Sequence, residues 1–326
     1  MNISKDKNNI ELSIVIPVFN ETENIKPLII KLFEVLNKTE KTYEVIMIDD
    51  GSTDNSFEVM REMCESHKKL RIIRFRRNFG QTSAFSAGFD LARGNIIVTL
   101  DADLQNDPAD IPKLLEELDK GYDIVSGWRK KRCDDFLTRQ LPSRIANYII
   151  SKFTGVPLHD YGCSLKAYRS EVIKNIKLYG EMHRFIPAVA SWMGVQVSEV
   201  EVNHAPRVSG KSNYGIMRTV RVLLDLITVK FLLGYSTKPI QVFGLFGSVS
   251  FLLGLIIAAY LSVTKIFLGH PLSDRPMLLM AALLIIFGVQ LCSIGLIGEM
   301  VVRNYYETND KPTYVIKEII EVKTKK

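Results

Sequence analysis

Two carboxylates with one residue between them follow a short apolar run in the first third of the chain. Asp101 and Asp103 come directly after the run 96–100, and Gln105 continues the same alternation. Alternate residues of an extended chain point to the same side, so these three side chains can converge. Adjacent carboxylates need a counter-charge, which a hard divalent cation such as Mg²⁺ or Mn²⁺ supplies. The pattern favours a metal site over the alternative, an acidic turn in solvent.

A second acidic pair, Asp49 and Asp50, follows the apolar run 43–48. A carboxylate at the carboxyl end of a strand can accept hydrogen bonds from a ribose or a base. The alternative is a role in shaping the turn and capping the next helix, which we favour for residues 52–54. For the pair itself we favour ligand binding, because adjacent carboxylates repel each other and one cap needs only one of them.

Strands and helices alternate over the first 200 residues, and this arrangement must position the acidic pairs. The strands are continuously apolar, which is typical of a parallel, doubly wound α/β sheet with ligands bound beyond the carboxyl ends of its strands. No glycine loop precedes a Lys-Ser or Lys-Thr pair, which argues against a P-loop nucleotidase. The predicted strands are 12–17, 43–48, 70–75, 96–100 and 123–126, and the predicted helices are 24–37, 54–67, 81–92 and 110–120.

The composition excludes general disorder, because 47% of the 326 residues are hydrophobic and the formal charge is only +6. Two windows without charged residues, 239–264 and 277–298, lie near the C-terminus. About 20 apolar residues span a bilayer, so both windows predict transmembrane helices rather than a buried pair in a soluble core. The N-terminus has no apolar signal core, and the four scattered cysteines fit a reducing cytosol.

Basic residues flank the two windows on the side of the large N-terminal part and of the tail, which the positive-inside rule places in the cytoplasm. We therefore predict a multi-pass inner-membrane protein with both termini cytoplasmic. Residues 216–235 have apolar residues at helical spacing and predict an interfacial amphipathic helix, with an ordinary core-facing helix as the alternative. The predicted parts are a cytosolic domain over 1–210, a juxtamembrane region over 211–238, spans over 239–264 and 277–300, an external loop over 265–276 and a cytosolic basic tail over 301–326.

Several motifs together resemble a known family. Four of them are similar to the inverting family-2 glycosyltransferases with the GT-A nucleotide-sugar fold: IPVFNE, DDGSTDNS, RNFGQTSAFSAGFDLARG and DADLQNDP. Two later stretches, DYGCSLKAYR and HAPRVSGKSNYG, resemble the polyprenyl-phosphate glycosyltransferases within that family. These include dolichyl-phosphate mannose synthases, bactoprenol glucosyltransferases and undecaprenyl-phosphate aminoarabinose transferases. No Gln-x-x-Arg-Trp signature of processive synthases is present, which favours transfer of a single sugar.

The resemblance implies a role for individual residues. It places the nucleoside on Pro17, Phe19, Glu21, Asp49, Asp50, Asp101 and Ala102. It assigns the metal on the diphosphate to Asp101, Asp103 and Gln105, and it makes Asp160 and Asp103 the catalytic residues, Asp160 being the usual candidate for a base. It assigns the lipid phosphate to Arg129, Arg139, Ser143 and Lys211, with Arg207 as a further candidate. For Arg139 and Arg207 the alternative is unspecific attraction to anionic lipid.

The implied reaction moves a sugar from a nucleoside diphosphate, with UDP favoured, to a polyprenyl phosphate such as undecaprenyl phosphate. A phosphate monoester is mostly dianionic at neutral pH, so it hardly needs a base, and we expect Asp160 mainly to orient groups. The resemblance also implies a homo-oligomer, possibly a tetramer, and no nucleic-acid partner. The alternatives are a sensor that binds without reacting, a lipid flippase or channel subunit, and a family-2 enzyme with a non-phosphate lipid or protein acceptor.

Overall fold

The structure is a computed structural model of the whole chain. It describes residues 10–130, 141–176, 178, 182–191, 194–206, 239–268, 276–308 and 316–321. These belong to two compact units, one formed by residues 1–229 with 312–326 and the other by residues 230–311. The predicted amphipathic helix over 216–235 and the predicted site residues Arg139, Arg207 and Lys211 lie outside the described residues.

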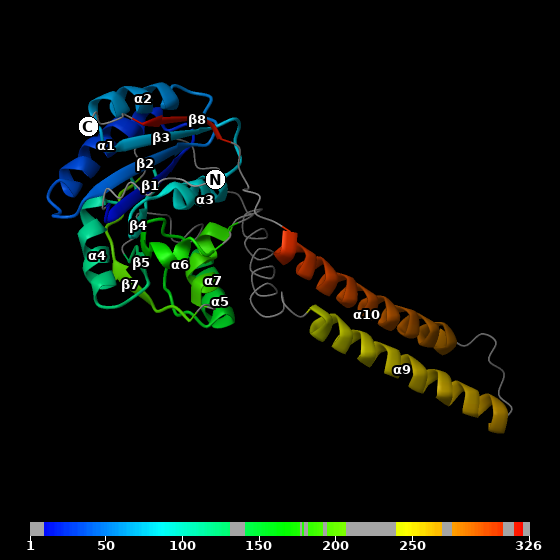
Figure 1. The fold of residues 1–326 in the computed structure, drawn as a ribbon. Coiled ribbons are helices and arrows are strands. Elements are labelled where there is room, and N and C mark those ends of the chain that lie inside the picture. The colour runs from blue at the N-terminus through cyan, green and yellow to red at the C-terminus, as the bar shows by residue number, and fades with distance from the viewer. Residues whose placement is uncertain are drawn as a thin grey trace. The chain divides into compact units, whose positions relative to one another are not determined.

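The first unit contains an eight-stranded sheet with the order β7-β5-β6-β4-β1-β2-β3-β8 (Figure 1). The prediction of a mostly parallel, doubly wound sheet is confirmed. Two strands run antiparallel to their neighbours: β6, which lies between β4 and β5, and β8, which pairs with β3 at the edge. The strands are β1 (Leu12–Val18), β2 (Tyr43–Asp49), β3 (Leu70–Phe75), β4 (Ile96–Thr99), β5 (Ile124–Trp128), β6 (Lys166–Arg169), β7 (Val197–Glu201) and β8 (Ile316–Glu321).

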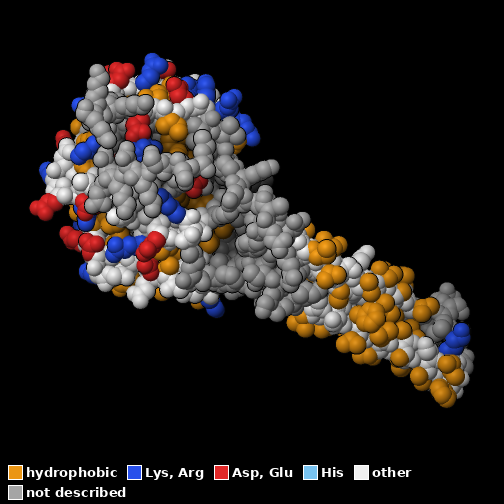
Figure 2. All heavy atoms as spheres, viewed as in Figure 1, with side chains coloured by type: hydrophobic (Ala, Val, Ile, Leu, Met, Phe, Trp, Pro, Cys, Tyr) orange, Lys and Arg blue, Asp and Glu red, His pale blue; other side chains and the backbone are white. Residues whose placement is uncertain are grey.

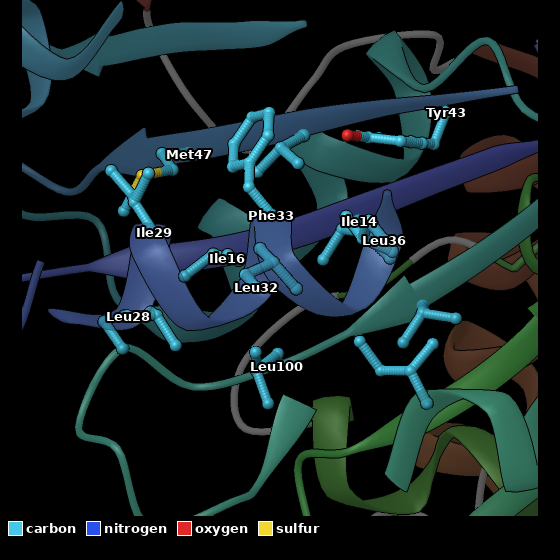
Figure 3. Close-up of a cluster of buried hydrophobic side chains, with 14 of the residues drawn as sticks. Ile14, Ile16, Leu28, Ile29, Leu32, Phe33, Leu36, Tyr43, Met47 and Leu100 are labelled. Carbon is cyan, nitrogen blue, oxygen red and sulfur yellow. The ribbon is translucent and has the colours of Figure 1, made fainter. Parts of the chain in front are cut away.

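Helices cover both faces of this sheet, and each face has its own apolar core. The side chains of α1, α2 and α4 pack on one face, and those of α3, η3 and α7 pack on the other. Figure 3 shows Leu28 and Leu32 of α1 in the same buried cluster as Ile14 and Ile16 of β1. The helices are α1 (Thr22–Leu36), α2 (Ser56–Ser66), α3 (Gln81–Leu91), η1 (Pro108–Asp110), α4 (Ile111–Asp119), α5 (Leu141–Thr154), α6 (Ser170–Ile173), η3 (Met182–Phe185) and α7 (Ile186–Ser191).

The central strands are buried on both faces, which explains why their sequences are continuously apolar. Every residue of β1 and β2 is buried. These two strands pair in parallel from Leu12↔Tyr43 to Val18↔Asp49, and β1 pairs in parallel with β4 as well. Their carboxyl ends therefore reach the same edge of the sheet, and the loops with the predicted site residues begin there.

The strand β8 lies in the region predicted as a basic tail, and no pattern in the sequence indicated it. It pairs with β3 from Arg71↔Glu321 to Phe75↔Ile316. The guanidinium of Arg93 donates two hydrogen bonds to the Glu321 carboxylate, at 2.7 and 3.1 Å. The segment after the hairpin is thus part of the same sheet as the N-terminal strands.

The second unit is a helical hairpin of α9 (Pro239–Leu268) and α10 (Pro276–Thr308). Both helices are long and apolar enough to cross a membrane, over Phe243–Phe267 and Pro276–Gly298. Few side chains in these windows are buried, and Figure 2 shows hydrophobic side chains covering the visible surface of the hairpin. Such exposure is not typical of helices buried in a soluble core, and it agrees with the prediction of two spans.

Small residues let the two helices of the hairpin approach each other closely. A Cβ atom on Gly247 would lie 2.7 Å from the Gly288 carbonyl oxygen, and one on Gly288 would lie 2.6 Å from the Gly247 carbonyl oxygen. The Ser250 hydroxyl donates a hydrogen bond of 2.9 Å to the Leu284 carbonyl of the other helix. Close backbone approach and interhelical hydrogen bonds are the usual stabilising contacts between helices in lipid.

Candidate active site

The loops after β1 and β2 are joined by hydrogen bonds between their polar residues. The Asn20 backbone N–H donates to the Ser52 hydroxyl at 3.1 Å, and the Asn20 side-chain oxygen accepts from the Thr53 N–H at 2.8 Å. The Thr22 hydroxyl donates to the Asp54 carboxylate at 2.6 Å. Residues 52–54 therefore shape the turn, as we predicted for them.

Asp49 is fully buried at the end of β2. One of its carboxylate oxygens accepts a hydrogen bond of 2.9 Å from the Ser52 N–H. The other lies 3.3 Å from Nε of Arg74, close enough for an ion pair, but it accepts no hydrogen bond from a described residue. The carboxylate is thus partly neutralised by its own surroundings.

Asp50 is buried as well, and its carboxylate organises the loop after β3. Its two oxygens accept hydrogen bonds from the N–H groups of Phe79 and Gly80, at 2.7 and 2.9 Å. Burial raises the pKa of Asp50, although these two N–H donors lower it. Gly51 has φ +71°, and a Cβ atom there would lie 2.5 Å from the Arg77 carbonyl carbon, so this turn requires glycine. Our argument that repulsion favours ligand binding by the pair is therefore weakened, because each carboxylate has its own partners.

The other residues predicted to hold the nucleoside lie at the same edge of the sheet. Pro17 is buried within β1, and Ala102 is buried in the loop after β4. The Phe19 side chain is 44% exposed, so its ring is available for stacking with a base. The Glu21 N–H donates to the Ser56 hydroxyl at 2.8 Å, which ties this loop to the start of α2. Their role in nucleoside binding stays a prediction.

A pocket beyond the ends of β4 and β5 brings the predicted metal residues together with the predicted phosphate-binding arginine. Asp101, Asp103 and Gln105 line it, and so does Arg129, which follows β5. The turn 161–164 forms another part of its wall. Residues from three separate stretches of the sequence thus share one cavity at the carboxyl ends of the strands.

The carboxylates of this pocket suit a cation. Burial, and then the charge of Asp103, raise the pKa of Asp101 to about 6. Gln81 donates one hydrogen bond of 2.7 Å to Asp101, and Asp103 accepts one of 3.2 Å from the Gln105 N–H. The described residues hold no cluster of three His, Cys, Asp or Glu side chains, so two carboxylates, the Gln105 amide and substrate oxygens would form the ligand set. A hard divalent cation such as Mg²⁺ or Mn²⁺ is bound in this way.

Asp160, which precedes the turn 161–164, forms a buried ion pair with Arg129. Nε and Nη2 of Arg129 donate to the two oxygens of Asp160, at 2.7 and 3.0 Å. Burial lowers the pKa of Arg129, but the Asp160 carboxylate more than offsets it and the net shift is upward. Arg129 keeps further N–H donors for a ligand, because a guanidinium carries five.

Sequence reasoning missed Lys166, which also lines the pocket. Its ammonium is buried and donates to the carbonyls of Tyr161, at 3.1 Å, and of Cys163. Burial lowers its pKa to about 8. A lysine between the apolar residues Leu165 and Ala167 is the signal that could have revealed it.

His183 and Arg184 of η3 line the same pocket and were missed as well. The Thr82 hydroxyl lies 2.7 Å from Nδ1 of His183, which links η3 to α3. No sequence signal connects two residues so distant along the chain. Ser143, one of the predicted phosphate contacts, lies in the first turn of α5 and is not among the described residues that line the pocket.

Sequence comparison places the chain in a known family. The profile described as Glycosyl transferase family 2 matches residues 13–177, and the profile described as GtrB C-terminal hairpin matches residues 238–303. The chain belongs to glycosyl transferase family 2. The resemblance found in the sequence motifs is thereby confirmed, and the second profile covers the hairpin of α9 and α10.

Curated relatives match almost the full chain. A dodecaprenyl-phosphate galacturonate synthase of Rhizobium johnstonii is 43% identical over 96% of this chain and 94% of the relative. An undecaprenyl-phosphate 4-deoxy-4-formamido-L-arabinose transferase of Edwardsiella ictaluri is 37% identical over 95% of this chain and 94% of the relative. Both relatives are named for a polyprenyl phosphate and a sugar.

Solved structures support the fold alone. Glucosyl-3-phosphoglycerate synthase of Mycobacterium tuberculosis, crystallised with Mn²⁺ and UDP-glucose, has a TM-score of 0.55 and 14% identity. The match covers 70% of this chain and 82% of that one. The GT-A fold expected from the motifs is therefore confirmed for the first unit.

Proposed function

We propose that this family-2 glycosyltransferase moves one sugar from a nucleoside diphosphate, with UDP favoured, to the phosphate of a membrane-embedded polyprenyl phosphate such as undecaprenyl phosphate. The observation that carries this proposal is that Asp101 and Asp103 line one pocket together with Arg129, which is ion-paired with Asp160. A donor diphosphate with its cation and an acceptor phosphate are both anions, and this pocket offers a place for a cation beside a guanidinium. The printed names of the two relatives support the same acceptor class.

The proposed reaction is a displacement at the anomeric carbon. An oxygen of the acceptor phosphate forms the new bond from the face opposite the diphosphate, and the bond from carbon to the diphosphate oxygen breaks, which inverts the configuration. Asp101, Asp103 and Gln105 would hold the cation. When bound, a divalent cation neutralises negative charge on the diphosphate, which is commonly a large contribution to catalysis.

The geometry of Asp160 favours an orienting role over a role as base. Both of its oxygens accept hydrogen bonds from Arg129, and one also accepts from the Gly162 N–H at 3.1 Å. A carboxylate that accepts hydrogen bonds on both oxygens is held in a fixed orientation, and it fixes the orientation of its donor in return. The acceptor is already dianionic at neutral pH. Asp160 therefore fixes the orientation of Arg129, whose remaining donors hold the phosphate oxygens in line with the sugar.

A long polyprenyl chain cannot leave the bilayer, so the enzyme must work at the membrane surface. The two helices of the hairpin are suited to anchor it there. The strand β8 follows the hairpin and pairs with β3, while the other strands precede the hairpin. This pairing supports a hairpin with both ends on one side of the membrane, and the positive-inside rule supports the cytoplasmic side.

A donor panel tests this proposal. The full-length protein in membranes is given undecaprenyl phosphate, Mg²⁺ or Mn²⁺, and UDP or GDP sugars, and the lipid products are identified by mass. The panel includes neutral sugars and uronic acids, because Arg184 lines the pocket and forms no ion pair with another described residue. We expect a glycosyl monophosphate lipid from at least one donor. Transfer to protein or to a neutral lipid, with none to the phosphate, would contradict the proposal.

The pH dependence of an Asp160→Asn variant separates the two roles of this carboxylate. If Asp160 orients Arg129, single-turnover transfer falls by a similar factor at every pH from 6 to 9. If it removes a proton, as a hydroxyl acceptor would require, an added base restores part of the activity. Such rescue would favour the alternative of a family-2 enzyme with a non-phosphate acceptor.

A further inference from the structure

The Glu199 side chain accepts hydrogen bonds from the backbone of Asp160, the candidate catalytic residue, and of His159 before it. This side chain comes from the edge strand β7 and is only 11% exposed. One of its oxygens accepts from the N–H groups of His159 and Asp160, at 2.9 and 3.0 Å. The other accepts from the His159 N–H at 3.1 Å and lies 2.7 Å from Nδ1 of that ring. One carboxylate thus fixes two consecutive backbone N–H groups.

Glu199 belongs to a row of three polar residues on neighbouring strands, next to the turn that follows Asp160. Ser126 of β5 pairs with Lys166 of β6 on one side and with Glu199 of β7 on the other. Directly paired residues of neighbouring strands point to the same face of a sheet, so the three side chains share one face. The row puts a cation and an anion on either side of a buried serine.

The two charges hold opposite parts of the same turn. The Lys166 ammonium donates hydrogen bonds to the carbonyls of Tyr161 and Cys163. The Glu199 carboxylate accepts from N–H groups that precede these residues, including that of Asp160. Arg129 completes the arrangement, because it binds the Asp160 side chain rather than its backbone. Asp160 is therefore fixed at its backbone by a side chain of β7 and at its carboxylate by the residue that follows β5.

We propose that Glu199 is a positioning residue for Asp160 and that it acts through the backbone N–H groups of the turn; the inference rests on the proposed function. Glu199 is not among the described residues that line the pocket, and the contacts it makes there are with the backbone of His159 and Asp160. Without its carboxylate two N–H groups lose their acceptor, and the turn can shift relative to Arg129. A displacement of about 1 Å in a catalytic group can cost about 10²-fold in rate.

The chain offers a matched control two residues further along the same strand. Glu201 forms an ion pair with Lys130, and both side chains are more than half exposed. A Glu201→Ala variant removes the same chemical group from the same strand without affecting the turn. A Glu199→Gln variant keeps a carbonyl oxygen that can accept from both N–H groups, so it tests rescue by a conservative change.

Hydrogen exchange and transfer are measured on the full-length variants. We expect Glu199→Ala to accelerate amide exchange in a peptide covering residues 159–163 and to lower kcat by about 10²-fold, with a smaller change in donor KM. We expect Glu199→Gln to keep most of the protection and activity, and Glu201→Ala to match the wild type in both. Unchanged exchange in Glu199→Ala would overturn the inference, whatever the enzyme transfers, so this outcome is distinct from a failure of the proposed function.

A double-mutant cycle with Asp160 separates positioning from a general loss of stability. If Glu199 acts through Asp160, the Glu199→Ala change costs little further activity in an Asp160→Ala background. If Glu199 only stabilises the fold, the two losses multiply. A multiplied loss would overturn the inference, and a loss equal to that of Asp160→Ala alone would support it.

Discussion

Two acidic pairs lie at the carboxyl ends of β2 and β4, the two strands that flank β1, and their surroundings differ. Asp49 and Asp50 lie at the end of β2, where backbone N–H groups and Arg74 surround them. Asp101 and Asp103 follow β4 and line a pocket, where burial and mutual repulsion raise the pKa of Asp101 to about 6. In the first pair three of the four carboxylate oxygens accept backbone hydrogen bonds, whereas at the second pair burial and repulsion outweigh the nearby charges of Arg129 and Lys166.

The comparison teaches that the same local signal can build a loop or a ligand site. In both pairs the carboxylates come directly after a buried strand, and adjacent charges alone do not separate the two outcomes. What separates them is the supply of donors from the rest of the chain. The loop after β3 provides two backbone N–H groups to Asp50, while Asp101 accepts from the side chains of Gln81 and Ser164.

Removing a charge from the second acidic pair, Asp101 and Asp103, is expected to have the largest effect. An Asp101→Asn variant should lose most Mn²⁺-dependent UDP binding, and transfer should fall by about 10³-fold, because an electrostatic contribution to catalysis is lost. Its thermal stability without metal should be no lower than that of the wild type, since the change relieves burial of a charge beside Asp103. Calorimetric titration with Mn²⁺ and UDP measures the first effect and thermal unfolding the second. A large drop in stability would break the contrast between the two pairs.

Breaking the buried ion pair should affect both stability and activity. Removing one partner of such a pair costs about 3–5 kcal/mol, because the other charge stays buried without a counter-charge. An Arg129→Met variant should lower the free energy of unfolding by this order, and a double Arg129→Met, Asp160→Asn variant should recover part of it. Urea unfolding of the wild type, the Arg129→Met and Asp160→Asn single variants and the double variant measures the coupling. Equal stability of the Arg129→Met variant and the wild type would contradict the pairing described here.

For the first acidic pair we expect the opposite of the Asp101→Asn result, namely a loss of stability without a loss of Mn²⁺ affinity. An Asp50→Asn variant replaces one acceptor oxygen by an amide that faces a backbone N–H, and an unsatisfied buried donor costs about 1–3 kcal/mol. Urea unfolding should show this loss, while Mn²⁺ affinity stays at the wild-type value. A reduced Mn²⁺ affinity with unchanged stability would contradict this prediction, because it would make Asp50 part of a cation site rather than a support of the loop.

The smallest effect is expected from the titration of Lys166. Burial lowers its pKa to about 8, so the folded protein loses this proton at a lower pH than an exposed lysine does. Raising the pH from 7 to 9 neutralises the ammonium, weakens its hold on the turn and should lower transfer a few-fold. A Lys166→Arg variant stays charged over this interval. The ratio of wild-type to variant activity should therefore fall with pH, and a constant ratio would show that Lys166 does not titrate there.

Much of the fold could be predicted because the central strands are continuous apolar runs. The predicted strand 43–48 corresponds to β2, and the predicted helix 81–92 corresponds to α3. Three strands, β6, β7 and β8, were missed because their patterns are weaker, and no residue of β7 is fully buried. The strand β6 has four residues, including a buried lysine, and β8 lies beyond the hairpin, where its pairing depends on contacts with β3 and Arg93.

The site could be predicted in part for a related reason. Carboxylates directly after a strand give a local signal, so Asp101 and Asp103 were found. Glu199 gave no such signal, because it lies within a strand and its partners are backbone N–H groups 39 and 40 residues away. Contacts of this kind depend on strand register across the sheet, which single-sequence patterns do not fix.

The central claim is that a cation held by Asp101 and Asp103 assists a lipid phosphate in displacing the nucleotide from the sugar. The most direct measurement is sugar transfer to undecaprenyl phosphate by the full-length wild type, Asp101→Ala and Asp103→Ala, each with EDTA and after restoring Mg²⁺ or Mn²⁺. We expect EDTA to stop the wild type, metal to restore it, and both variants to stay inactive throughout. Transfer at the wild-type rate by either variant, or in the presence of EDTA, would contradict the claim.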